Sequence, residues 1–227
     1  MKQLPSNKRV PNQYHLKLFT GDKYKGLPVL KLRGGLVVEY LDKLYSVIQH
    51  SLQKHSRILA VRVDLHFPQD YHPVEQEALS NHYLQSFVKA LRHRLRQYRV
   101  NKQRVGQRVH DVEFDYVWAR EIGAESNKPH FHLLLLFNGH AFRGVGNFST
   151  EYESLYNRLI ESWAEVLGLS HVAEGAAYVH FPANGQYWVH SGHRKQLEEL
   201  FYRASYLTKI ATKDFDGGFH VFGGSRV

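Results

Sequence analysis

Residues 128–137 read KPHFHLLLLF, and the organisation of the chain is best understood outward from this stretch. After Pro129 the run is apolar, rich in residues that pack on a pleated surface, and too short for an ordinary helix, so it predicts a buried strand. Side chains two positions apart lie on one face of a strand, which places His130 and His132 side by side. Two neighbouring imidazoles at a strand end suit a divalent metal. Two histidines that merely begin a buried strand are equally compatible with this stretch alone.

A second strand is predicted over 58–67, ILAVRVDLHF, and ends at Pro68. Its apolar residues alternate with Arg62, Asp64 and His66, which share the opposite face. Two interpretations stay open: a solvent-exposed face with a local ion pair, or a face turned toward an active site.

A third strand is predicted over 111–122, and a loop at 123–129 connects it to the histidine strand in a hairpin-like unit. The hairpin can bring Glu121 opposite the strand end that carries His130 and His132. Two nitrogens and one oxygen leave coordination positions open for water or a phosphate oxygen, as in catalytic rather than structural sites. This ligand set accepts Mn²⁺, Mg²⁺ or Zn²⁺, so it does not fix the metal.

Apolar residues at helical spacing predict helices over about 36–54, 74–99 and 193–213, and a further helix that Ser149-Thr150 and Glu153 cap and Gly168 ends. Segments 176–181 and 186–190 look like a hairpin around 182–185. The first 35 residues look like an irregular arm. We therefore expect an N-terminal arm and helix over 1–57, packed on a core domain over 58–227.

The composition favours an anionic partner. The 227 residues carry a net charge of +9, which points to nucleic acid above all. The absence of cysteine excludes disulfides, thiolate zinc sites and cysteine nucleophiles. No apolar segment near the start resembles a signal peptide and no run is long enough to span a membrane, so we expect a soluble cytoplasmic protein without a membrane partner.

Positive charge is concentrated in the second half of the helix over 74–99 and just after it. A solvated helix face is the usual reason for such a run, and contact with DNA phosphates is the alternative. The candidates for that contact are Arg92, Arg96, Arg99, Lys102 and Arg104.

The helix over 193–213 has an unusual polar stripe. At about 100° per residue, Tyr202, Tyr206, Lys209 and Lys213 lie opposite its apolar side. They can be incidental residues of a solvated helix. Alternatively, a tyrosine is the nucleophile of a phosphoryl transfer, with lysine stabilising the phosphate and the developing phenolate. Lys213 is also a candidate DNA contact.

These motifs, in this order, resemble those of the HUH endonucleases, which start rolling-circle replication or mobilise single-stranded DNA. HFH at 130–132 matches their two-histidine motif, and YLTK at 206–209 looks like the tyrosine motif of their Rep branch. The resemblance is closest to inovirus gene-II-type replication proteins and YagK/YfjJ-like prophage proteins. It runs from about residue 57 to the end, through LAVRVDL at 59–65, WARE at 118–121, SYLTK at 205–209 and FGGSR at 222–226. Many HUH proteins carry threonines where this chain has Arg62 and Asp64, which leaves open whether these two support the metal ligands.

The resemblance implies an α+β fold with a central antiparallel sheet flanked by helices, as in ferredoxin-like and RRM-like HUH cores. It also implies metal-dependent, site-specific nicking and joining of single-stranded DNA. Tyr206 would attack the scissile phosphorus and form a 5′-phosphotyrosine, with Lys209 beside it. Tyr202 would perform a second transfer or be structural. The metal, Mn²⁺ or Mg²⁺ with Zn²⁺ also compatible, would be held by Glu121, His130 and His132.

The partners implied are single-stranded DNA or a DNA hairpin at a replication origin, in a bacterial host and encoded by a phage or prophage. A helicase would be a separate host protein, because the chain has no P-loop motif. Two rival functions remain: a single-stranded nucleic-acid-binding module without catalysis, and a metal phosphodiesterase that uses water. The stripe of Tyr202, Tyr206 and Lys209 favours the tyrosine mechanism over both.

Overall fold

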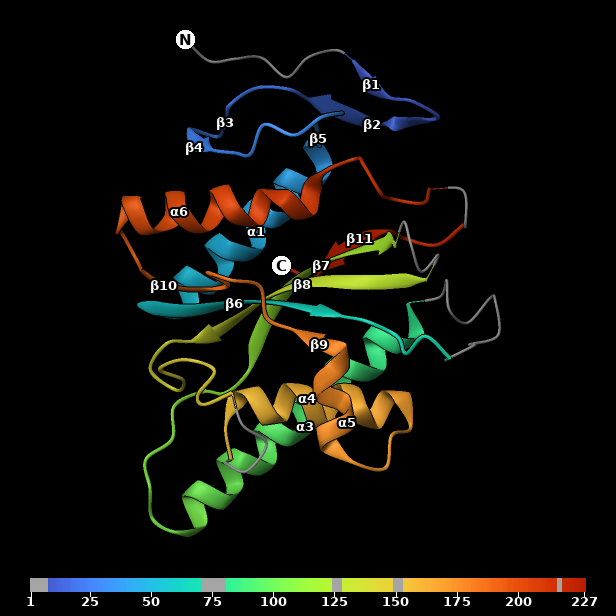
Figure 1. Cartoon of the computed structure of the whole chain (residues 1–227). Helices are drawn as coiled ribbons and strands as arrows, with labels where there is room; N and C mark the ends of the chain where they lie inside the picture. Colours follow the sequence, from blue (N-terminus) through green and yellow to red (C-terminus); the bar gives the residue numbers. More distant parts are fainter. Residues whose placement is uncertain (1–7, 71–80, 124–127, 149–152, 216–217) are drawn as a thin grey trace.

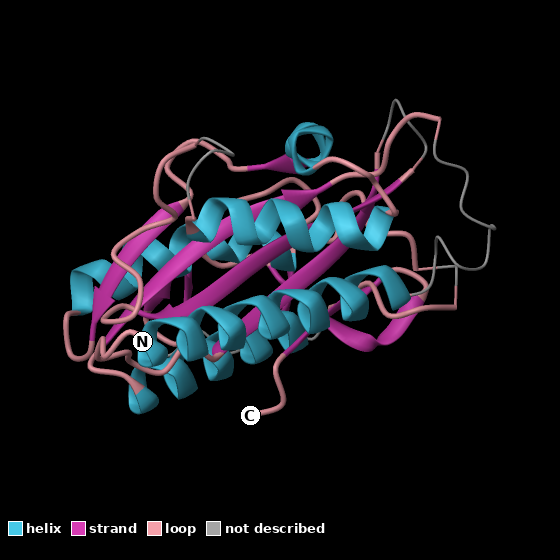
Figure 2. Cartoon of the chain, turned by 90° about the horizontal axis from the view of Figure 1, so that it is seen from below, coloured by secondary structure: helices cyan, strands magenta, loops and turns pink. Residues whose placement is uncertain are grey.

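A computed structural model describes residues 8–70, 81–123, 128–148, 153–215 and 218–227 of the chain. Its centre is a six-stranded antiparallel sheet in the order β10-β6-β8-β7-β11, with β9 pairing β6 beside β10. The strands are β6 (Arg57–Leu65), β7 (Phe114–Ile122), β8 (Pro129–Asn138), β9 (Val179–His180), β10 (Gln186–His190) and β11 (Phe222–Gly224). Helices cover both faces of this sheet (Figures 1 and 2), so the expected α+β fold class is confirmed.

One face of the sheet carries α1 (Val38–Lys54) and α6 (Arg194–Ala204), which the 3₁₀ turn η2 (Ser205–Thr208) follows. The other face carries α3 (His82–Arg104) and α4 (Leu155–Leu167), with the short α5 (Val172–Gly175) and η1 (Ala176–Tyr178) beside them. Among the described helices, none is both long enough and apolar enough to cross a bilayer.

Strand alternation divides the core into two apolar clusters, one on each face of the sheet. The central strand β8 shows the division, because Leu133 and Leu135 pack toward α3 and α4 whereas Leu134 and Leu136 pack toward α1 and α6. Each fully buried aliphatic side chain of this kind contributes about 1.5–3 kcal/mol of burial free energy. The sheet is therefore held from both sides, which makes it a rigid platform for side chains at its ends.

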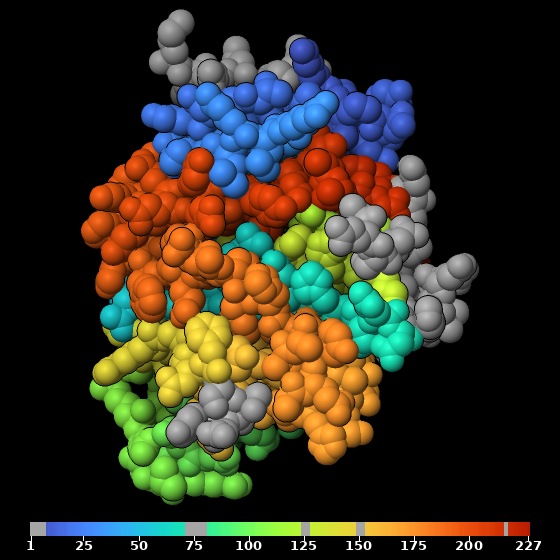
Figure 3. Space-filling view, in the orientation of Figure 1, coloured from blue at the N-terminus to red at the C-terminus, as the bar shows by residue number. Residues whose placement is uncertain are grey.

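The N-terminal segment forms short strands rather than the expected irregular arm. They are β1 (Arg9–Val10), β2 (Gln13–Phe19) and β5 (Leu36–Val37) in one small sheet, and β3 (Lys23–Tyr24) with β4 (Leu27–Pro28) in another. This segment, blue in Figure 3, lies over α6 and the residues after it. The backbone N–H of Leu30 donates to Ser205 Oγ at 3.0 Å, and Ile210 N–H donates to the Gly35 carbonyl at 3.3 Å.

The expected hairpin of 176–181 with 186–190 does not form. Instead β9 pairs with β6 at Asp64 and Leu65, and β10 pairs with the same strand over 57–61. The chain keeps its direction through 182–185, because β9 and β10 both run antiparallel to β6. Within this connection, the Gly185 carbonyl accepts a hydrogen bond of 2.7 Å from Arg62 N–H. The two segments are thus one interrupted edge strand.

The expected helix over 193–213 ends early, at Ala204. The hydroxyls of Ser205 and Thr208 donate to main-chain carbonyls three residues back, at 2.6 and 2.7 Å, which competes with the helical pattern. Lys209 is extended and forms a bridge to Leu36. The continuous stripe of two tyrosines and two lysines is therefore wrong as a helical feature.

The other helix ends agree in part with expectation. Gly168 ends α4 in the left-handed conformation, as expected. The residue that caps its start is Ser154, whose Oγ accepts from Asn157 N–H at 3.1 Å, whereas the predicted cap at 149–150 lies outside the described residues. The predicted start of the long basic helix, at 74–80, also lies outside them. Its described part begins at His82 and continues past the expected end, to Arg104.

Candidate metal and tyrosine site

The site lies where the sheet face under α1 and α6 changes from apolar to polar. Along three adjacent strands, the buried apolar residues of this face are followed by polar residues on the same face. On β6 these are Arg62 and Asp64, on β8 His132 and His130, and on β7 Glu121. Antiparallel pairing sets Glu121 opposite His130 and Asp64 opposite His132, so the register alone brings the five side chains together.

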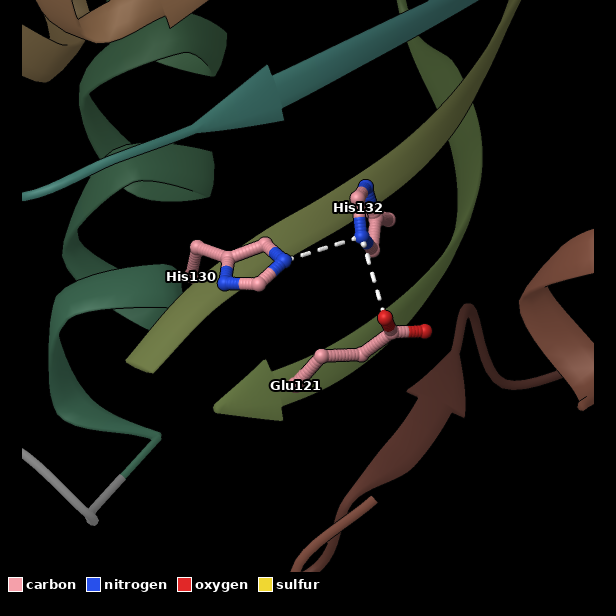
Figure 4. A group of neighbouring side chains, drawn as sticks. All are labelled: Glu121, His130 and His132. Carbon is pink, nitrogen blue, oxygen red and sulfur yellow. Dashed lines mark hydrogen bonds and ion pairs between the residues drawn. The ribbon is translucent and has the colours of Figure 1, made fainter. Parts of the chain in front are cut away.

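Glu121, His130 and His132 offer ligand atoms that all lie within 4.8 Å of one another (Figure 4). The two Nε2 atoms are 3.1 Å apart, and Nε2 of His132 is 3.4 Å from Glu121 Oε2. Glu121 and His132 are buried and His130 is partly exposed, so the cluster is accessible from one side. The expected set of two nitrogens and one oxygen is assembled as a group that could hold a metal ion.

Asp64 orients His132 for such a role. Its Oδ1 is 2.7 Å from Nδ1 of His132, which directs Nε2 toward Glu121 and His130. This is the carboxylate–histidine arrangement that commonly supports metal-binding imidazoles. Arg62 holds the same Oδ1 at 3.1 Å. The ion pair expected as one alternative for this strand face therefore exists, but it is largely buried and adjoins the ligand cluster.

The two histidines differ in their proton affinity. Burial, His132 and His66 lower the pKa of His130 to about 4, so its ring is neutral at neutral pH. Burial opposes charge on His132 as well, but hydrogen bonds to Asp64 and Glu121 outweigh it and raise its pKa. When both ring nitrogens of His132 carry protons, Nδ1 faces Asp64 and Nε2 faces Glu121.

Glu121 is held by several polar partners at once. Burial would raise its pKa, but His132, Lys213, Thr212 and Lys209 together hold the pKa far below the usual range. Its Oε2 accepts from Thr212 Oγ1 at 2.6 Å and from Lys209 Nζ at 2.9 Å. Its Oε1 is 3.7 Å from Lys213 Nζ, and neither of these two buried atoms has a hydrogen-bond partner among the described residues.

Tyr206 joins this cluster through Lys209. The Lys209 ammonium donates to the Tyr206 hydroxyl at 2.5 Å and lies 3.9 Å from the centre of its ring. The Tyr206 ring meets the His132 ring edge-on, with centroids 5.8 Å apart, and the guanidinium carbon of Arg62 lies 5.7 Å from the Tyr206 centroid. A phenol, a lysine and the candidate metal ligands therefore form one connected group.

Other predicted site residues lie elsewhere. Tyr202 is on α6, 40% exposed, and has no contact with Glu121, His130 or His132 in the described structure. Lys213 is buried against Glu121 instead of facing solvent, and burial lowers its pKa to about 8. It is not the surface DNA contact that the helical stripe predicts.

Helix α3, which carries the basic residues, covers the face of the sheet opposite α1 and α6 (Figure 1), whereas the ligand cluster lies on the face under α1 and α6. Arg96 pairs with Glu113 at 2.9 Å, and Arg92 is 3.9 Å from the same carboxylate. Arg99 and Arg104 are exposed, and Lys102 lies 5.8 Å from the centre of the Tyr98 ring. The structure does not bring these five residues to the candidate site.

Thr212 is the site residue that sequence reasoning missed. Its φ of +69° is unusual for a β-branched residue, and its hydroxyl donates to Glu121 while its carbonyl accepts from Ile122 N–H at 3.2 Å. No periodicity in the sequence marks it, because its position follows from the break after Ala204.

Comparisons with known proteins agree on one family. The model of the YagK/YfjJ C-terminal domain matches residues 19–225. The chain is 28% identical over 198 residues to the uncharacterized protein YagK of Escherichia coli strain K12, covering 84% of this chain and 94% of YagK. It is 30% identical over 203 residues to the uncharacterized protein YfjJ of the same strain, covering 85% of this chain and 96% of YfjJ. No solved structure matches. The chain belongs to the YagK/YfjJ C-terminal domain family.

Proposed function

We propose that this chain is an HUH-type endonuclease that nicks and rejoins single-stranded DNA through a 5′-phosphotyrosine on Tyr206, and so initiates rolling-circle replication of a phage or mobile element. The observation that carries the proposal is the position of Lys209, whose ammonium contacts both the Tyr206 hydroxyl and the Glu121 carboxylate. A nucleophile beside a cation and a metal-ligand group is the arrangement that phosphoryl transfer needs.

The donor set fits a divalent metal. Two imidazole nitrogens and one carboxylate oxygen converge, and Asp64 fixes the ring of His132 from behind. Glu121, His130 and His132 would hold Mn²⁺ or Mg²⁺, and Zn²⁺ is compatible with the same donors. The bound ion would supply a Lewis acid that polarises a non-bridging phosphate oxygen.

The protein side chains supply the remaining steps. The Tyr206 hydroxyl loses its proton to solvent as its oxygen forms a bond to the scissile phosphorus. The bond from phosphorus to the 3′ oxygen breaks, and that oxygen takes up a proton from solvent and leaves as a hydroxyl. Lys209 stabilises negative charge on the phenolic oxygen while it attacks. Arg62, whose guanidinium carbon lies 5.7 Å from the centre of the Tyr206 ring, would add positive charge near the phosphate. Joining is the reverse reaction, in which a 3′-hydroxyl displaces Tyr206.

The charge of the site suits a phosphodiester. Among the described residues, three basic side chains, Arg62, Lys209 and Lys213, surround two carboxylates, Asp64 and Glu121, before any metal binds. An excess of buried positive charge favours an anionic ligand. The expected partners are single-stranded DNA or a DNA hairpin at an origin, in the bacterial cytoplasm, with strand separation left to a host helicase.

The test is covalent capture of DNA. The protein is incubated with a pool of single-stranded oligonucleotides and Mn²⁺, and a DNA-dependent shift is sought on a denaturing gel. The proposal expects an adduct that disappears with chelator, in Tyr206→Phe and in His132→Ala, and that survives in Tyr202→Phe. Cleavage that persists in Tyr206→Phe without an adduct would favour water as the nucleophile. Tight, chelator-insensitive binding without cleavage would favour the binding module.

A further inference from the structure

In the described structure, one oxygen of the Glu121 carboxylate is close to three polar side chains. Oε2 of Glu121 accepts from Thr212 Oγ1 at 2.6 Å and from Lys209 Nζ at 2.9 Å, and it is also the oxygen nearest Nε2 of His132, at 3.4 Å. A carboxylate oxygen offers about two lone-pair directions. Thr212 and Lys209 occupy them, so a metal that binds this oxygen together with the histidines must displace one of the two.

Thr212 is the less replaceable partner. Its backbone is held at φ +69°, and its carbonyl is tied to Ile122 N–H beside Glu121. A residue in this sparsely populated conformation persists only where its surroundings impose it. Both partners have a second acceptor nearby, since the Thr212 hydroxyl also contacts the Ala211 carbonyl and the Lys209 ammonium contacts the Tyr206 hydroxyl. Lys209 differs in its long side chain and in its positive charge. A dication and an ammonium on one oxygen would also repel each other.

Lys213 keeps the carboxylate neutralised during such an exchange. Its ammonium faces the other oxygen, Oε1, at 3.7 Å, and its side chain is fully buried. Glu121 is therefore held by Lys213 and Thr212 on fixed sides, and by Lys209 on a side that can open.

We infer that Lys209 is an exchangeable counter-cation of Glu121: a divalent metal takes its place on Oε2, and the released ammonium is then held by the Tyr206 hydroxyl alone. The inference rests on the function proposed above, because it assumes that Glu121, His130 and His132 bind a metal. Metal loading and the environment of the nucleophile are then coupled, so a site without metal keeps Lys209 shared between carboxylate and phenol.

The coupling predicts opposite effects of two substitutions on metal affinity, which can be measured without DNA. Lys209→Met removes the competitor and tightens Mn²⁺ binding, whereas Tyr206→Phe removes the acceptor that holds the released ammonium and weakens it. Each change is expected to be about fivefold or more, within the usual range for coupled sites. In the double variant the effect of Tyr206→Phe disappears, since Lys209 is no longer present to be held.

The experiment titrates Mn²⁺ into the full chain and follows free Mn²⁺ by electron paramagnetic resonance. Lys195→Met on the exposed face of α6 and Tyr14→Phe near the N-terminus, which is 77% exposed, are the matched controls. Lys209→Gln is a second neutral variant in case Lys209→Met does not fold, and thermal melting checks every protein.

The outcomes separate the inference from the proposed function. Tighter binding by Lys209→Met or Lys209→Gln, with weaker binding by Tyr206→Phe, supports the exchange. Unchanged or weaker binding by both lysine variants overturns it, while His132-dependent Mn²⁺ binding and adduct formation by the wild type would leave the proposed function intact. If the wild-type protein binds Mn²⁺ no more tightly than His132→Ala does, both the inference and the proposed function are overturned.

Discussion

Replacing Asp64 by asparagine tests whether the carboxylate behind His132 prepares that ring for a metal. Oδ1 of Asp64 lies 2.7 Å from Nδ1 of His132 and is the side-chain oxygen that fixes the ring's orientation. Asparagine keeps the volume but loses the negative charge. It can also present its amide N–H₂ to Nδ1, which would favour the tautomer that carries its proton on Nε2, the nitrogen that a metal needs free.

The expected loss of metal affinity follows from the known effect of such supporting groups. Removing the carboxylate behind a metal-binding histidine typically weakens binding by about 10- to 100-fold. This corresponds to about 1.4–2.8 kcal/mol. Mn²⁺ titration of Asp64→Asn measures it directly.

Asp115 on β7, which lies on the other side of β8 from β6, supplies a matched control. Its carboxylate is also buried and accepts from Ser51 Oγ at 2.9 Å and Lys54 Nζ at 3.3 Å, but none of these contacts reaches the metal ligands. Asp115→Asn should leave Mn²⁺ affinity unchanged. If Asp64→Asn binds Mn²⁺ within about threefold of Asp115→Asn, the supporting role assigned to Asp64 is wrong.

Four further outcomes follow from the same contacts. Glu121→Gln leaves Lys213 buried without a counter-charge, so thermal melting should show that the protein is destabilised. The loss of unfolding free energy should approach about 3–5 kcal/mol, which is typical of a broken buried ion pair, and adding Lys213→Met should restore part of it. Because binding must remove the proton of His132, whose pKa is raised, Mn²⁺ affinity should fall by about tenfold per pH unit below that pKa and be constant above it, and a flat profile would count against His132 as a ligand. Thr212→Val vacates one direction on Oε2 but also removes the neutral hydroxyl that orients the Glu121 carboxylate. We expect the loss of orientation to dominate, because no repelling charge is removed, so Thr212→Val should weaken Mn²⁺ binding severalfold while Thr212→Ser, which keeps the hydroxyl, does not; equal effects would show that only the backbone matters. Arg99→Glu, on the far face of the sheet, should leave Mn²⁺ affinity unchanged, and if Arg99 contacts DNA it should lower the salt dependence of single-strand binding by about 0.7 in the log–log slope per lost phosphate contact.

The ligand cluster could be predicted from the sequence because it follows from strand alternation. Side chains alternate with a period of two in any strand. Once residues 130–137 form a strand, His130 and His132 must therefore share a face. The short loop before Pro129 made an antiparallel pair with the preceding strand the natural arrangement, and it set Glu121 opposite His130. Arg62 and Asp64 were found in the same way, but their role was not, because it depends on which strand pairs with β6.

The region after Ala204 could not be predicted in the same way. Helical spacing continues in the sequence to Lys213, yet the helix ends at Ala204. Ser205 and Thr208 form local hydrogen bonds, and Leu36 and Gly35 of the N-terminal segment pair with Lys209 and Ile210. The contacts with the N-terminal segment join residues from opposite ends of the chain and leave no local pattern. Tyr206 and Lys209 reached the site all the same, because they lie just beyond the break.

Mass spectrometry of the DNA-linked peptide tests the central claim most directly. Protein incubated with Mn²⁺ and an oligonucleotide that it cleaves is digested with protease and nuclease, and the modified residue is identified. We predict a 5′-phosphate of DNA on the oxygen of Tyr206, and no such peptide from Glu121→Gln or from chelator-treated protein. A nucleotide attached to Tyr202 instead would contradict the assignment of the nucleophile, and cleaved DNA without any linked peptide would contradict the tyrosine mechanism itself.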